Sequence, residues 1–481
     1  MKKNVCRLRS FWVFVFFGIF FSDFSPYFCI PILTRTSVTR TRVSDLVPTT
    51  TPQRRKSIYK KTKHSFSFLI VVQNEAATSS MMKFPSVWKT ALVRSILLGC
   101  VLPLATAFVG SGGVVHHGAT LTLSTTTTQL QLQVSSDSQL AQLAGMTTLS
   151  IDSGDLDVIR EFAATGYITD ATTNPLFVSQ AGMRGDPVYA QMVEDAVTYA
   201  LQQAQGSSDD DDATISLAID RLAVNLGKSI SDIVQGYIST EVDPRLSFDT
   251  QASVERGRRI IAMYEDMGVP KSRVLIKLAA TWEGIKAAEI LEAEGIQCNL
   301  TLIFSVVQAV ACAQYGAHLI SPFPGRILDW YKNNQGRAQG VSPDDDEGVI
   351  ACRVMYNYFK HHGHDTICMP ASWRPSRGPG YELDEIIALA GSDRMTIPAP
   401  LLEKLAASTQ PLEQKLSLGT VSPVDAMGAS GKLTEKEFRF LLNMDGCGTD
   451  KLAEGIRAFV GETEKLEQVL RAKVQAMVAS T

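Results

Sequence analysis

Short apolar runs alternate with longer, helix-like segments along the chain from about residue 147 onward. The runs are four to six residues long, while the segments between them carry apolar side chains at helical spacing. Strands separated by helices predict βαβ units and a parallel sheet. Eight candidate strands can be counted: Thr148–Asp152, Tyr167–Asp170, Tyr237–Thr240, Val274–Leu278, Cys298–Ile303, His318–Ser321, Thr366–Ala371 and Arg394–Pro398.

The segments between these runs contain signals for the ends of helices. Asp186 followed by Pro187 is typical of an N-cap and the first helical position. Thr281 is expected to cap a helix that Gly295 ends, and Gly316 is expected to close the helix before the sixth strand. Eight strand–helix repeats within roughly 250–320 residues predict an α/β fold, a (β/α)8 TIM barrel with a single catalytic domain.

Polar side chains stand where the predicted strands end. A TIM barrel forms its active site from the carboxyl ends of its strands. Turn chemistry explains Asp152 or Asn174 taken singly, but it does not explain a lysine, a glutamate and an arginine that converge on one rim. The candidate rim residues, in chain order, are Asp152, Thr172, Asn174, Glu241, Lys277, Asn299, Thr301, Ser321, Ser372 and Arg374.

Lys277 is the most unusual of these residues because it interrupts the apolar run Val274–Ala280. Lysine is seldom buried without a partner, and desolvation lowers the pKa of a lysine amine, which makes the amine a nucleophile for Schiff-base chemistry. Taken alone, the run favours a solvated lysine on an edge strand, or one that snorkels out of a core. The polar rim around it favours the catalytic interpretation.

Charge is distributed unevenly along the chain. Residues 1–80 contain 13 Lys/Arg and 3 Asp/Glu, whereas residues 138–481 contain 30 Lys/Arg and 45 Asp/Glu. A body this acidic would repel a phosphate backbone, so we expect no nucleic-acid partner. Five cysteines after residue 138 show no metal-binding spacing and predict buried thiols in a reduced compartment.

The N-terminal region has the pattern of targeting segments. The apolar run Phe11–Phe21 fits a short signal region. A second run, Ser95–Ala107, follows basic residues and ends in Ala105-Thr106-Ala107 before Phe108, which matches signal cleavage. We expect translation to start at Met81 or Met82, with residues 1–80 either non-native or an extra disordered leader. A signal peptide is then expected in 81–107, a transit-peptide-like segment in 108–138 and the barrel in 139–475. This order resembles presequences for complex plastids, so a plastid stroma is expected; a longer genuine leader, the cytoplasm and the secretory route stay open.

Six runs of residues in the barrel region resemble the transaldolase family, and the resemblance covers about residues 140–475. The runs are Asp170–Pro175, Ile238–Asp243, Leu275–Ala279, Cys298–Leu302, Ile320–Trp330 and Asp450–Arg457. Their number and order make the match more specific than a single motif. The resemblance implies a class I, Schiff-base transaldolase of the pentose phosphate pathway. Such an enzyme transfers a dihydroxyacetone unit between sedoheptulose 7-phosphate with glyceraldehyde 3-phosphate and erythrose 4-phosphate with fructose 6-phosphate.

The resemblance also implies a role for each position. Lys277 matches the lysine that attacks the ketone, and Asp152 matches the general acid/base. Glu241 and Thr301 match the pair that binds the catalytic water. The positions that match substrate-binding residues are Thr172, Asn174, Asn299, Ser321 and Phe323 for the sugar and Arg326, Ser372 and Arg374 for the phosphate. Arginine suits a phosphate because its planar guanidinium donates hydrogen bonds in pairs.

Two departures from the family pattern affect the phosphate site. The segment Trp373–Gly380 is longer than the usual loop and adds Arg377, and Trp373 stands where phenylalanine is expected. Two structural alternatives stay open: an ion pair of Arg326 with Asp329, and Asp152 as a helix N-cap. The acidic tract Asp209–Asp212 is expected to be a solvated loop, and Asp445–Gly448 a turn, rather than metal sites.

The resemblance implies neither a cofactor nor a metal, because the imine itself accepts the electrons. Sugar phosphates are the expected partners, with no stable membrane association after processing; a homodimer is an assembly that the sequence allows. One alternative is a fructose 6-phosphate aldolase, which releases free dihydroxyacetone; Glu241 favours transaldolase over it. The other alternative is a non-catalytic barrel.

Overall fold

The computed structural model describes residues 133–480, apart from 205–210, 338–339 and 429–430. The predicted leader in 1–80, the predicted signal peptide in 81–107 and residues 108–132 of the transit-like segment therefore lie outside the described residues. Residues 139–475, the predicted barrel region, are described except for the three internal gaps.

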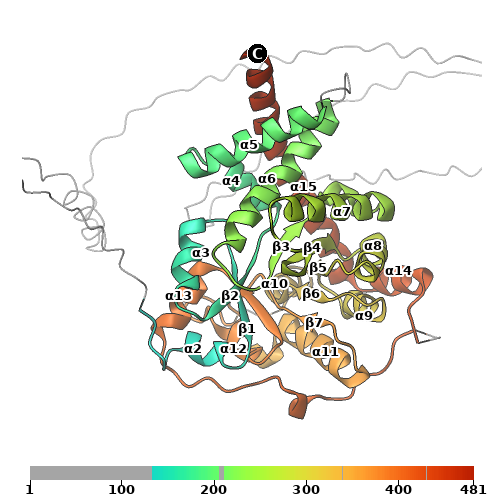
Figure 1. Ribbon diagram of the computed structural model, residues 1–481. Coiled ribbons are helices and arrows are strands. Elements are labelled where there is room, and N and C mark those ends of the chain that lie inside the picture. The colour runs from blue at the N-terminus through green and yellow to red at the C-terminus, as the bar shows by residue number, and fades with distance from the viewer. Residues whose placement is uncertain (1–132, 205–210, 338–339, 429–430, 481) are drawn as a thin grey trace, which may run out of the picture. The chain divides into compact units, whose positions relative to one another are not determined.

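Eight parallel strands form the centre of the molecule (Figure 1). They follow the order β7-β6-β5-β4-β3-β2-β1-β8, so that each strand pairs with its neighbours in the sequence and β1 pairs with β8. A hydrogen bond of 3.2 Å from the backbone N–H of Thr396 to the carbonyl of Pro370 joins β8 to the segment after β7 and closes the barrel. The strands are β1 (Thr148–Asp152), β2 (Ile168–Thr172), β3 (Ile238–Glu241), β4 (Val274–Ala279), β5 (Cys298–Ile303), β6 (Leu319–Pro322), β7 (Ile367–Cys368) and β8 (Arg394–Ile397).

Helices surround the barrel and fill the segments between its strands (Figure 1). Short 3-10 segments precede or follow several of them: η2 (Pro244–Leu246), η3 (Lys271–Arg273), η4 (Pro343–Asp345) and η5 (Leu418–Thr420). The α-helices are α2 (Gln139–Ala144), α3 (Leu156–Ala163), α4 (Pro175–Met183), α5 (Pro187–Ala204), α6 (Asp211–Ser231), α7 (Thr250–Asp266), α8 (Trp282–Ala293), α9 (Val306–Gln314), α10 (Pro324–Asn334), α11 (Glu347–His362), α12 (Asp384–Ala388), α13 (Ala399–Ala407), α14 (Glu435–Met444) and α15 (Gly446–Ser480).

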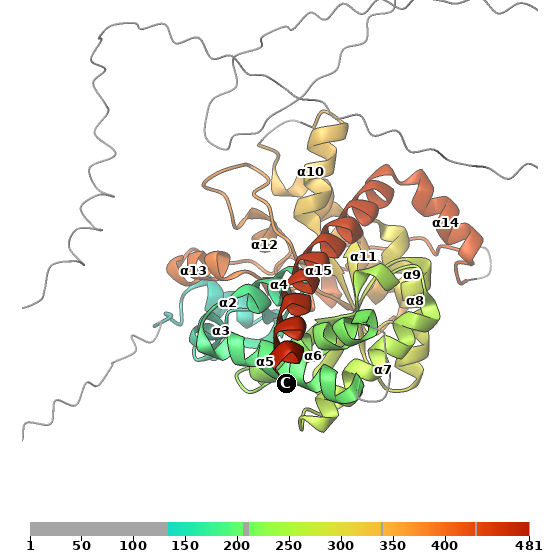
Figure 2. The ribbon, with the colours of Figure 1, turned by 90° about the horizontal axis from the view of Figure 1, so that it is seen from above.

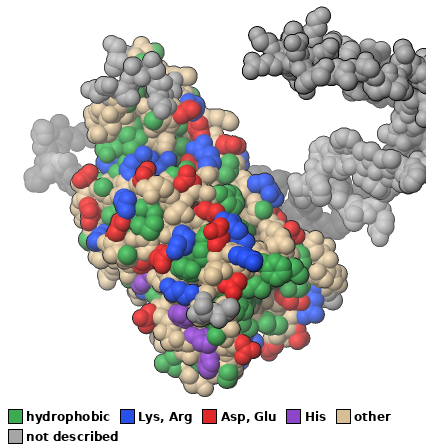
Figure 3. Space-filling view, turned by 90° about the vertical axis from the view of Figure 1, so that its right-hand side faces the viewer, with side chains coloured by type: hydrophobic (Ala, Val, Ile, Leu, Met, Phe, Trp, Pro, Cys, Tyr) green, Lys and Arg blue, Asp and Glu red, His purple; other side chains and the backbone are tan. Residues whose placement is uncertain are grey.

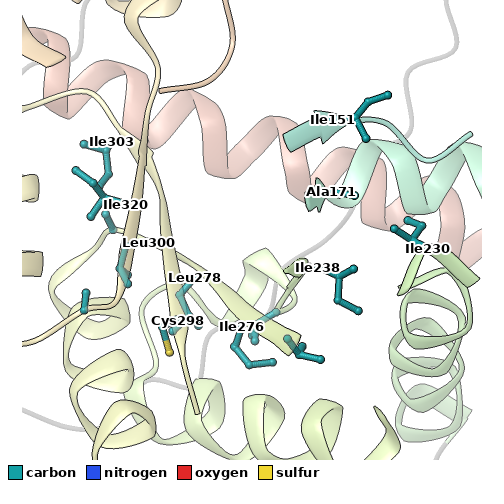
Figure 4. Close-up of a cluster of buried hydrophobic side chains, with 14 of the residues drawn as sticks. Ile151, Ala171, Ile230, Ile238, Ile276, Leu278, Cys298, Leu300, Ile303 and Ile320 are labelled. Atoms are coloured by element: carbon teal, nitrogen blue, oxygen red, sulfur yellow. The ribbon is translucent and has the colours of Figure 1, made fainter. Parts of the chain in front are cut away.

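Alternation along β4 explains how a lysine enters so apolar a strand. Ile276 and Leu278 belong to the large cluster of buried side chains that includes residues of the neighbouring strands and helices (Figure 4). Leu275 belongs instead to a small cluster with Leu319 and Met369. Because successive side chains of a strand point to opposite faces, Leu275 and Lys277 share the inner face of the barrel.

The long helix α15 crosses the carboxyl ends of the strands (Figure 2). It starts beside α14 and reaches α4, α5 and α6 near its end. Along the way Ile456 and Phe459 join a buried cluster with Leu302 of β5 and Phe304, which follows that strand. This helix therefore covers part of the rim on which an active site is expected.

The eight predicted strands and the TIM barrel are confirmed. Four strands differ in length from the prediction, β4 being one residue longer and β8 one residue shorter, and β3 and β6 are each shifted by one residue. β2 begins at Ile168 and extends to Thr172, and β7 covers only Ile367–Cys368. Pro370 shortens β7 because proline has no N–H for the ladder, although Ala371 still donates to the carbonyl of Pro322 at 2.9 Å.

The helix signals read from the sequence are also confirmed. α5 begins at Pro187, and the hydroxyl of Thr281 accepts a hydrogen bond from the N–H of Gly284 to cap α8. Gly295 and Gly316 follow α8 and α9 with φ angles of +74° and +80°, which a residue with a Cβ adopts only at a cost.

Two predictions about acidic segments are wrong in part. Asp209 and Asp210 lie outside the described residues, but Asp211 and Asp212 begin α6 instead of a loop. Gly446 to Gly448 are the first turn of α15, because the carboxylate of Asp445 accepts the N–H of Gly448 at 2.9 Å, as an N-cap does.

The surface carries both signs of charge. Figure 3 shows acidic and basic side chains interspersed over one face of the molecule. Within the described residues no helix is long and apolar enough to cross a membrane. The same residues hold no group of three or more His, Cys, Asp or Glu arranged to bind a metal. The five described cysteines are free and buried, as predicted.

Candidate active site

A cavity of about 220 Å³ opens at the carboxyl ends of the barrel strands. Nine of the twelve predicted site residues line it, and the other three lie beside or beneath them. The lining residues are Asp152, Thr172, Asn174, Lys277, Ser321, Phe323, Arg326, Ala371, Ser372, Trp373, Arg374, Thr396, Pro398 and Phe459. Polar strand ends that are distant in the sequence therefore share one small space.

Lys277 lies inside the barrel, on a central strand. Only 5% of its surface is exposed, and β4 pairs with strands on both sides, so the edge-strand and snorkelling alternatives are wrong. Its register partners are Glu241 on β3 and Asn299 on β5. The amine Nζ donates to the carbonyl of Thr173 at 3.2 Å and reaches into the cavity.

Glu241 is the nearest carboxylate to this amine. Its Oε2 lies 3.4 Å from Nζ of Lys277, which is an ion-pair distance rather than a short hydrogen bond. Burial raises the pKa of Glu241 to about 7, against the lowering effect of the Lys277 charge. A carboxyl that titrates near neutral pH is suited to general acid–base catalysis.

Thr301 lies on β5, the strand that pairs with β4 on the side opposite β3. Its register partner is Ala279 of β4, and its hydroxyl is buried without a hydrogen-bond partner among the described residues. The following residue, Leu302, has a φ of +57°, and the register of β5 with β6 shifts at this point. Such backbone strain persists where the surrounding structure fixes it, here by packing of Leu302 against Gly455 of α15.

Asp152 ends β1 on the other side of the cavity. One of its oxygens accepts a hydrogen bond of 2.9 Å from the hydroxyl of Thr172, whose oxygen lies 2.6 Å from that of Thr396. Burial raises the pKa of Asp152, while the charge of Lys277 opposes this shift. The N-cap of α3 is Asp155, so the N-cap alternative for Asp152 is wrong.

The amide and hydroxyl groups predicted to hold the sugar are placed in two ways. Asn174 caps α4 with its Oδ1, which leaves its NH2 group to face the cavity. Asn299 does not line the cavity. Instead it accepts a hydrogen bond of 2.8 Å from the hydroxyl of Ser321 and donates one of 3.3 Å to Ser239, so it orients a residue that does line the cavity.

Two arginines give the cavity an anion-binding side. Arg326 lies in the first turn of α10 and donates from Nε to the hydroxyl of Ser372 at 3.1 Å. Arg374 lies close enough to lower the pKa of the largely buried Arg326 guanidinium, after the effect of burial itself. A helix N-terminus with two guanidinium groups is well suited to a phosphate. Asp329 pairs with Arg374 at 3.3 Å, so the predicted alternative, an ion pair with Arg326, is wrong.

Arg377 is not part of this site. The sequence placed it near the phosphate because it belongs to the loop that follows β7. Its guanidinium pairs with Asp384 and stacks over the ring of Tyr381 at 3.9 Å, and it does not line the cavity. It therefore anchors the loop.

Sequence reasoning missed several lining residues. Thr396 is the penultimate residue of β8 and lines the cavity; its hydroxyl, near the end of an otherwise apolar run, is the signal that could have found it. Phe459 comes from α15, far along the chain, and gave no signal because its helix had no predicted place on the barrel. Trp373 was seen only as a substitution; its indole N–H donates to the carbonyl of Thr396 at 2.8 Å and closes that side.

The arrangement combines a buried amine, two carboxyl groups with raised pKa values and an anion site. An amine can form an imine with a ketone, and carboxyl groups can move the protons that imine formation and carbon–carbon cleavage require. Two acidic groups in different surroundings can take different parts in one reaction.

Comparison with known proteins gives a consistent result. The family model described as Transaldolase/Fructose-6-phosphate aldolase matches residues 149–470. A protein named transaldolase from Alteromonas mediterranea is 49% identical over 340 residues, which are 70% of this chain and 99% of that protein. Transaldolases from Pseudoalteromonas atlantica and Methylobacillus flagellatus are 48% and 49% identical, over 70% and 69% of this chain and 99% and 98% of their own lengths.

Proposed function

Since this chain belongs to the transaldolase/fructose-6-phosphate aldolase family, we propose that it is a Schiff-base transaldolase of the pentose phosphate pathway. It transfers a dihydroxyacetone unit between sedoheptulose 7-phosphate with glyceraldehyde 3-phosphate and erythrose 4-phosphate with fructose 6-phosphate. The observation that carries the proposal is the placement of Lys277, a buried amine that lines the same cavity as Asp152 and the two arginines.

The first step forms the imine. The uncharged amine of Lys277 attacks the ketone carbon of the donor, and the carbonyl oxygen leaves as water once it has gained two protons. Glu241 is 3.4 Å from this amine and has a pKa of about 7, so it can exchange protons with the amine and with water. The free hydroxyl of Thr301 on the neighbouring strand supplies a second group to hold that water.

The second step cleaves the carbon–carbon bond. Asp152 takes the proton of the donor hydroxyl next to the bond, the aldehyde product leaves, and the bonding electrons move into the imine to give an enamine. The Thr172 hydroxyl that donates to Asp152 fixes the carboxylate for this transfer. Attack of the enamine on an acceptor aldehyde, with the proton returned from Asp152, and hydrolysis of the new imine complete the transfer.

The arginine side of the cavity holds the phosphate and so sets the register of the sugar. Arg326 and Ser372 are already hydrogen-bonded to each other, which orients both toward the anion. Phe323 lies beneath the guanidinium of Arg326, with 5.0 Å between the guanidinium carbon and the ring centre. Correct placement of the reacting carbon at Lys277 then follows from binding at the distant phosphate.

The acceptor requirement distinguishes the proposed reaction from that of a fructose 6-phosphate aldolase, which the same family model includes. A transaldolase needs an acceptor aldehyde to turn over, whereas an aldolase releases dihydroxyacetone from fructose 6-phosphate alone. We expect glyceraldehyde 3-phosphate release from fructose 6-phosphate to depend on added erythrose 4-phosphate. Turnover without an acceptor would favour the aldolase, and lack of imine formation would favour a non-catalytic barrel.

We further propose that translation starts at Met81 or Met82 and that the enzyme acts in a plastid stroma, after removal of its leader segments in 81–107 and 108–138. Support comes from the order of the segments: an apolar run, the small residues Ala105-Thr106-Ala107 and then Phe108. Sequencing the N-terminus of the native protein tests this. A mature end upstream of Met81 would contradict both the proposed start and the proposed cleavage.

A further inference from the structure

Two buried carboxyl groups lie behind the anion side of the cavity and have no part in the chemistry above. Glu385 of α12 is 1% exposed and Asp346, the N-cap of α11, is 0% exposed. They are neighbours: α12 packs against η4, the segment that Asp346 directly follows.

Each carboxyl group holds a backbone segment with one oxygen and leaves the other oxygen unused. Glu385 accepts the N–H of Arg374 with Oε2 at 2.6 Å. Asp346 accepts the N–H groups of Gly348 and Val349 with Oδ1, at 2.7 and 3.3 Å. The remaining atoms, Oε1 of Glu385 and Oδ2 of Asp346, are buried without a hydrogen-bond partner among the described residues.

The segments held by these two groups are those that carry the arginines of the anion site. A side chain at Gly348 would meet the carbonyl of Pro324 at 2.1 Å, so α11 begins directly against the start of α10. A side chain at Gly325 would meet Ser372 and Arg374 backbone atoms at 2.5 and 2.6 Å. The start of α10, which carries Arg326, is therefore clamped between α11 and the loop of Arg374.

The loop that carries Ser372 and Arg374 requires support from the elements packed against it. Ser372 has a φ of +60°, a left-handed conformation that is strained for a residue with a Cβ. The bond from Arg374 N–H to Glu385 comes two residues later and fixes the exit of this turn. The chain of contacts thus runs from Asp346 through α11 and α10 to Arg374 and returns through Glu385.

We propose that Glu385 and Asp346 share one proton between their unused oxygens, and that this carboxyl–carboxylate pair is a positioning device for the two arginines of the anion site. Two buried carboxyl groups cannot both be charged at low cost, and a hydrogen bond between them satisfies both unused oxygens. The proposal rests on the proposed function, since it concerns the binding of a phosphorylated sugar.

The electrostatic surroundings agree with a neutral Glu385. Burial, and next the charge of Asp346, hold the pKa of Glu385 well above its usual range, and Asp329 acts in the same direction while Arg374 opposes it. Burial likewise raises the pKa of Asp346 to about 6, where Glu347 adds to the shift and Lys332 opposes it. The other titratable neighbour is the thiol of Cys352 on α11, whose pKa burial raises further.

The test uses three variants of the full chain, each measured with two substrates. Glu385→Ala removes the pair. Glu385→Gln keeps an acceptor for Arg374 and supplies an amide donor toward Asp346. Glu292→Gln is the matched control, because Glu292 also accepts backbone N–H groups, those of Cys298 and His318, but at the opposite end of the barrel. Borohydride trapping of the imine is measured against the concentration of fructose 6-phosphate and of dihydroxyacetone, which has no phosphate.

We expect Glu385→Ala to raise the half-saturating concentration of fructose 6-phosphate about tenfold and to leave that of dihydroxyacetone within about twofold. Glu385→Gln restores tight binding, and Glu292→Gln leaves it unchanged. In the wild type the half-saturating concentration of fructose 6-phosphate rises at alkaline pH, as Glu385 loses its proton, whereas in Glu385→Gln it stays level. If Glu385→Ala does not fold, this pH comparison decides alone.

Three results would overturn the proposal: equal losses for both substrates in Glu385→Ala, a failure of Glu385→Gln to rescue binding at any pH, or a loss in Glu292→Gln as large as in Glu385→Ala. Failure of the proposed function is distinguishable, because the wild type would then trap neither substrate.

Discussion

At each end of this barrel, desolvation raises the pKa of one carboxyl group to about 7, and only one of the two groups lies at a site suited to chemistry. Glu241 is at the carboxyl end of β3, beside Lys277. Glu292 is on α8 at the opposite end of the barrel, beside the start of β5 and the approach to β6. By pKa alone the two groups cannot be told apart.

Their partners differ. One oxygen of Glu292 accepts the backbone N–H groups of Cys298 and His318, both at 2.8 Å, and so joins the starts of two neighbouring strands. Glu241 has an oxygen that faces a lysine amine at 3.4 Å, and the hydroxyl of Thr301, two strands away, has no hydrogen-bond partner among the described residues. A raised pKa marks burial, whereas groups left available to a substrate mark the site of reaction.

Other charged groups at the amino end of the barrel are also bound to protein partners. Asp170 forms an ion pair with Arg394 and also accepts the N–H of Tyr237 at 3.2 Å. Arg394 stacks over the ring of Tyr237 at 4.8 Å, and that ring meets His318 edge-on. These charged and aromatic groups engage one another, as expected for a stabilising layer at this end.

The largest effect is expected from removing the amine. Lys277→Met should lower kcat/KM by about 10⁴-fold or more, since a nucleophile that forms a covalent intermediate acts as a unit with its partners. The unfolding transition should stay cooperative, because a methionine fits the same buried space. Steady-state kinetics and thermal unfolding check both statements, and substantial residual turnover would contradict the role of the lysine.

Asp152→Asn tests the proton transfer on the other side of the cavity. The amide preserves the contact with Thr172 but cannot take a proton, so we expect a loss of about 10²–10⁴-fold in kcat. Imine trapping at Lys277 should persist, because the ketone can still be attacked. A variant that lost trapping and turnover together would show that Asp152 acts before cleavage.

Glu241→Gln sharpens the comparison through its pH dependence. As a carboxylate Glu241 can accept protons, and its pKa is about 7, so wild-type kcat/KM should fall as pH drops below about 7. The variant should lose about 10²-fold in activity. Its remaining activity should no longer fall as the pH drops below about 7. An unchanged pH profile in the variant would show that another group causes the fall in activity at acid pH.

Glu292→Gln is the matched change at the other end, and it should alter stability rather than activity. The folded pKa of Glu292 is raised to about 7 from 4.5, so its charge costs the folded state stability as pH rises through that range. The amide keeps an acceptor and removes the charge. We expect the variant to gain about 1–2 kcal/mol on the wild type between pH 5 and pH 8, allowing for partial exposure.

Denaturant unfolding at both pH values measures this gain, and kcat/KM at pH 8 should stay within about twofold of the wild type. A large loss of activity would show that the amino end is coupled to the site and would remove the contrast between the two ends.

Local pattern was enough to predict the barrel and most of its rim. Each strand is a short apolar run, and a polar residue at or near its end lies toward the carboxyl end of the barrel, so Asp152 and Lys277 could be brought together without a structure. The sequence could also place Asn174, although its N-cap bond to α4 emerges only from the geometry.

Contacts between distant elements could not be predicted in this way. Phe459 reaches the cavity because α15 crosses the rim, and its packing partner Leu302 is more than 150 residues earlier in the chain. The ion pair of Arg374 with Asp329, in place of the expected pair with Arg326, depends on the path of the loop after β7. The local spacing of hydrophobic positions reveals neither the packing of distant elements nor the path of a loop.

The central claim is that the amine of Lys277 forms the covalent intermediate. Incubation with fructose 6-phosphate and borohydride, followed by mass spectrometry of the digested protein, tests this directly. The account predicts a reduced three-carbon dihydroxyacetone adduct on the peptide that contains Lys277, and on no other lysine. An adduct confined to a different lysine, or a protein left unmodified while it turns over substrate, would contradict it.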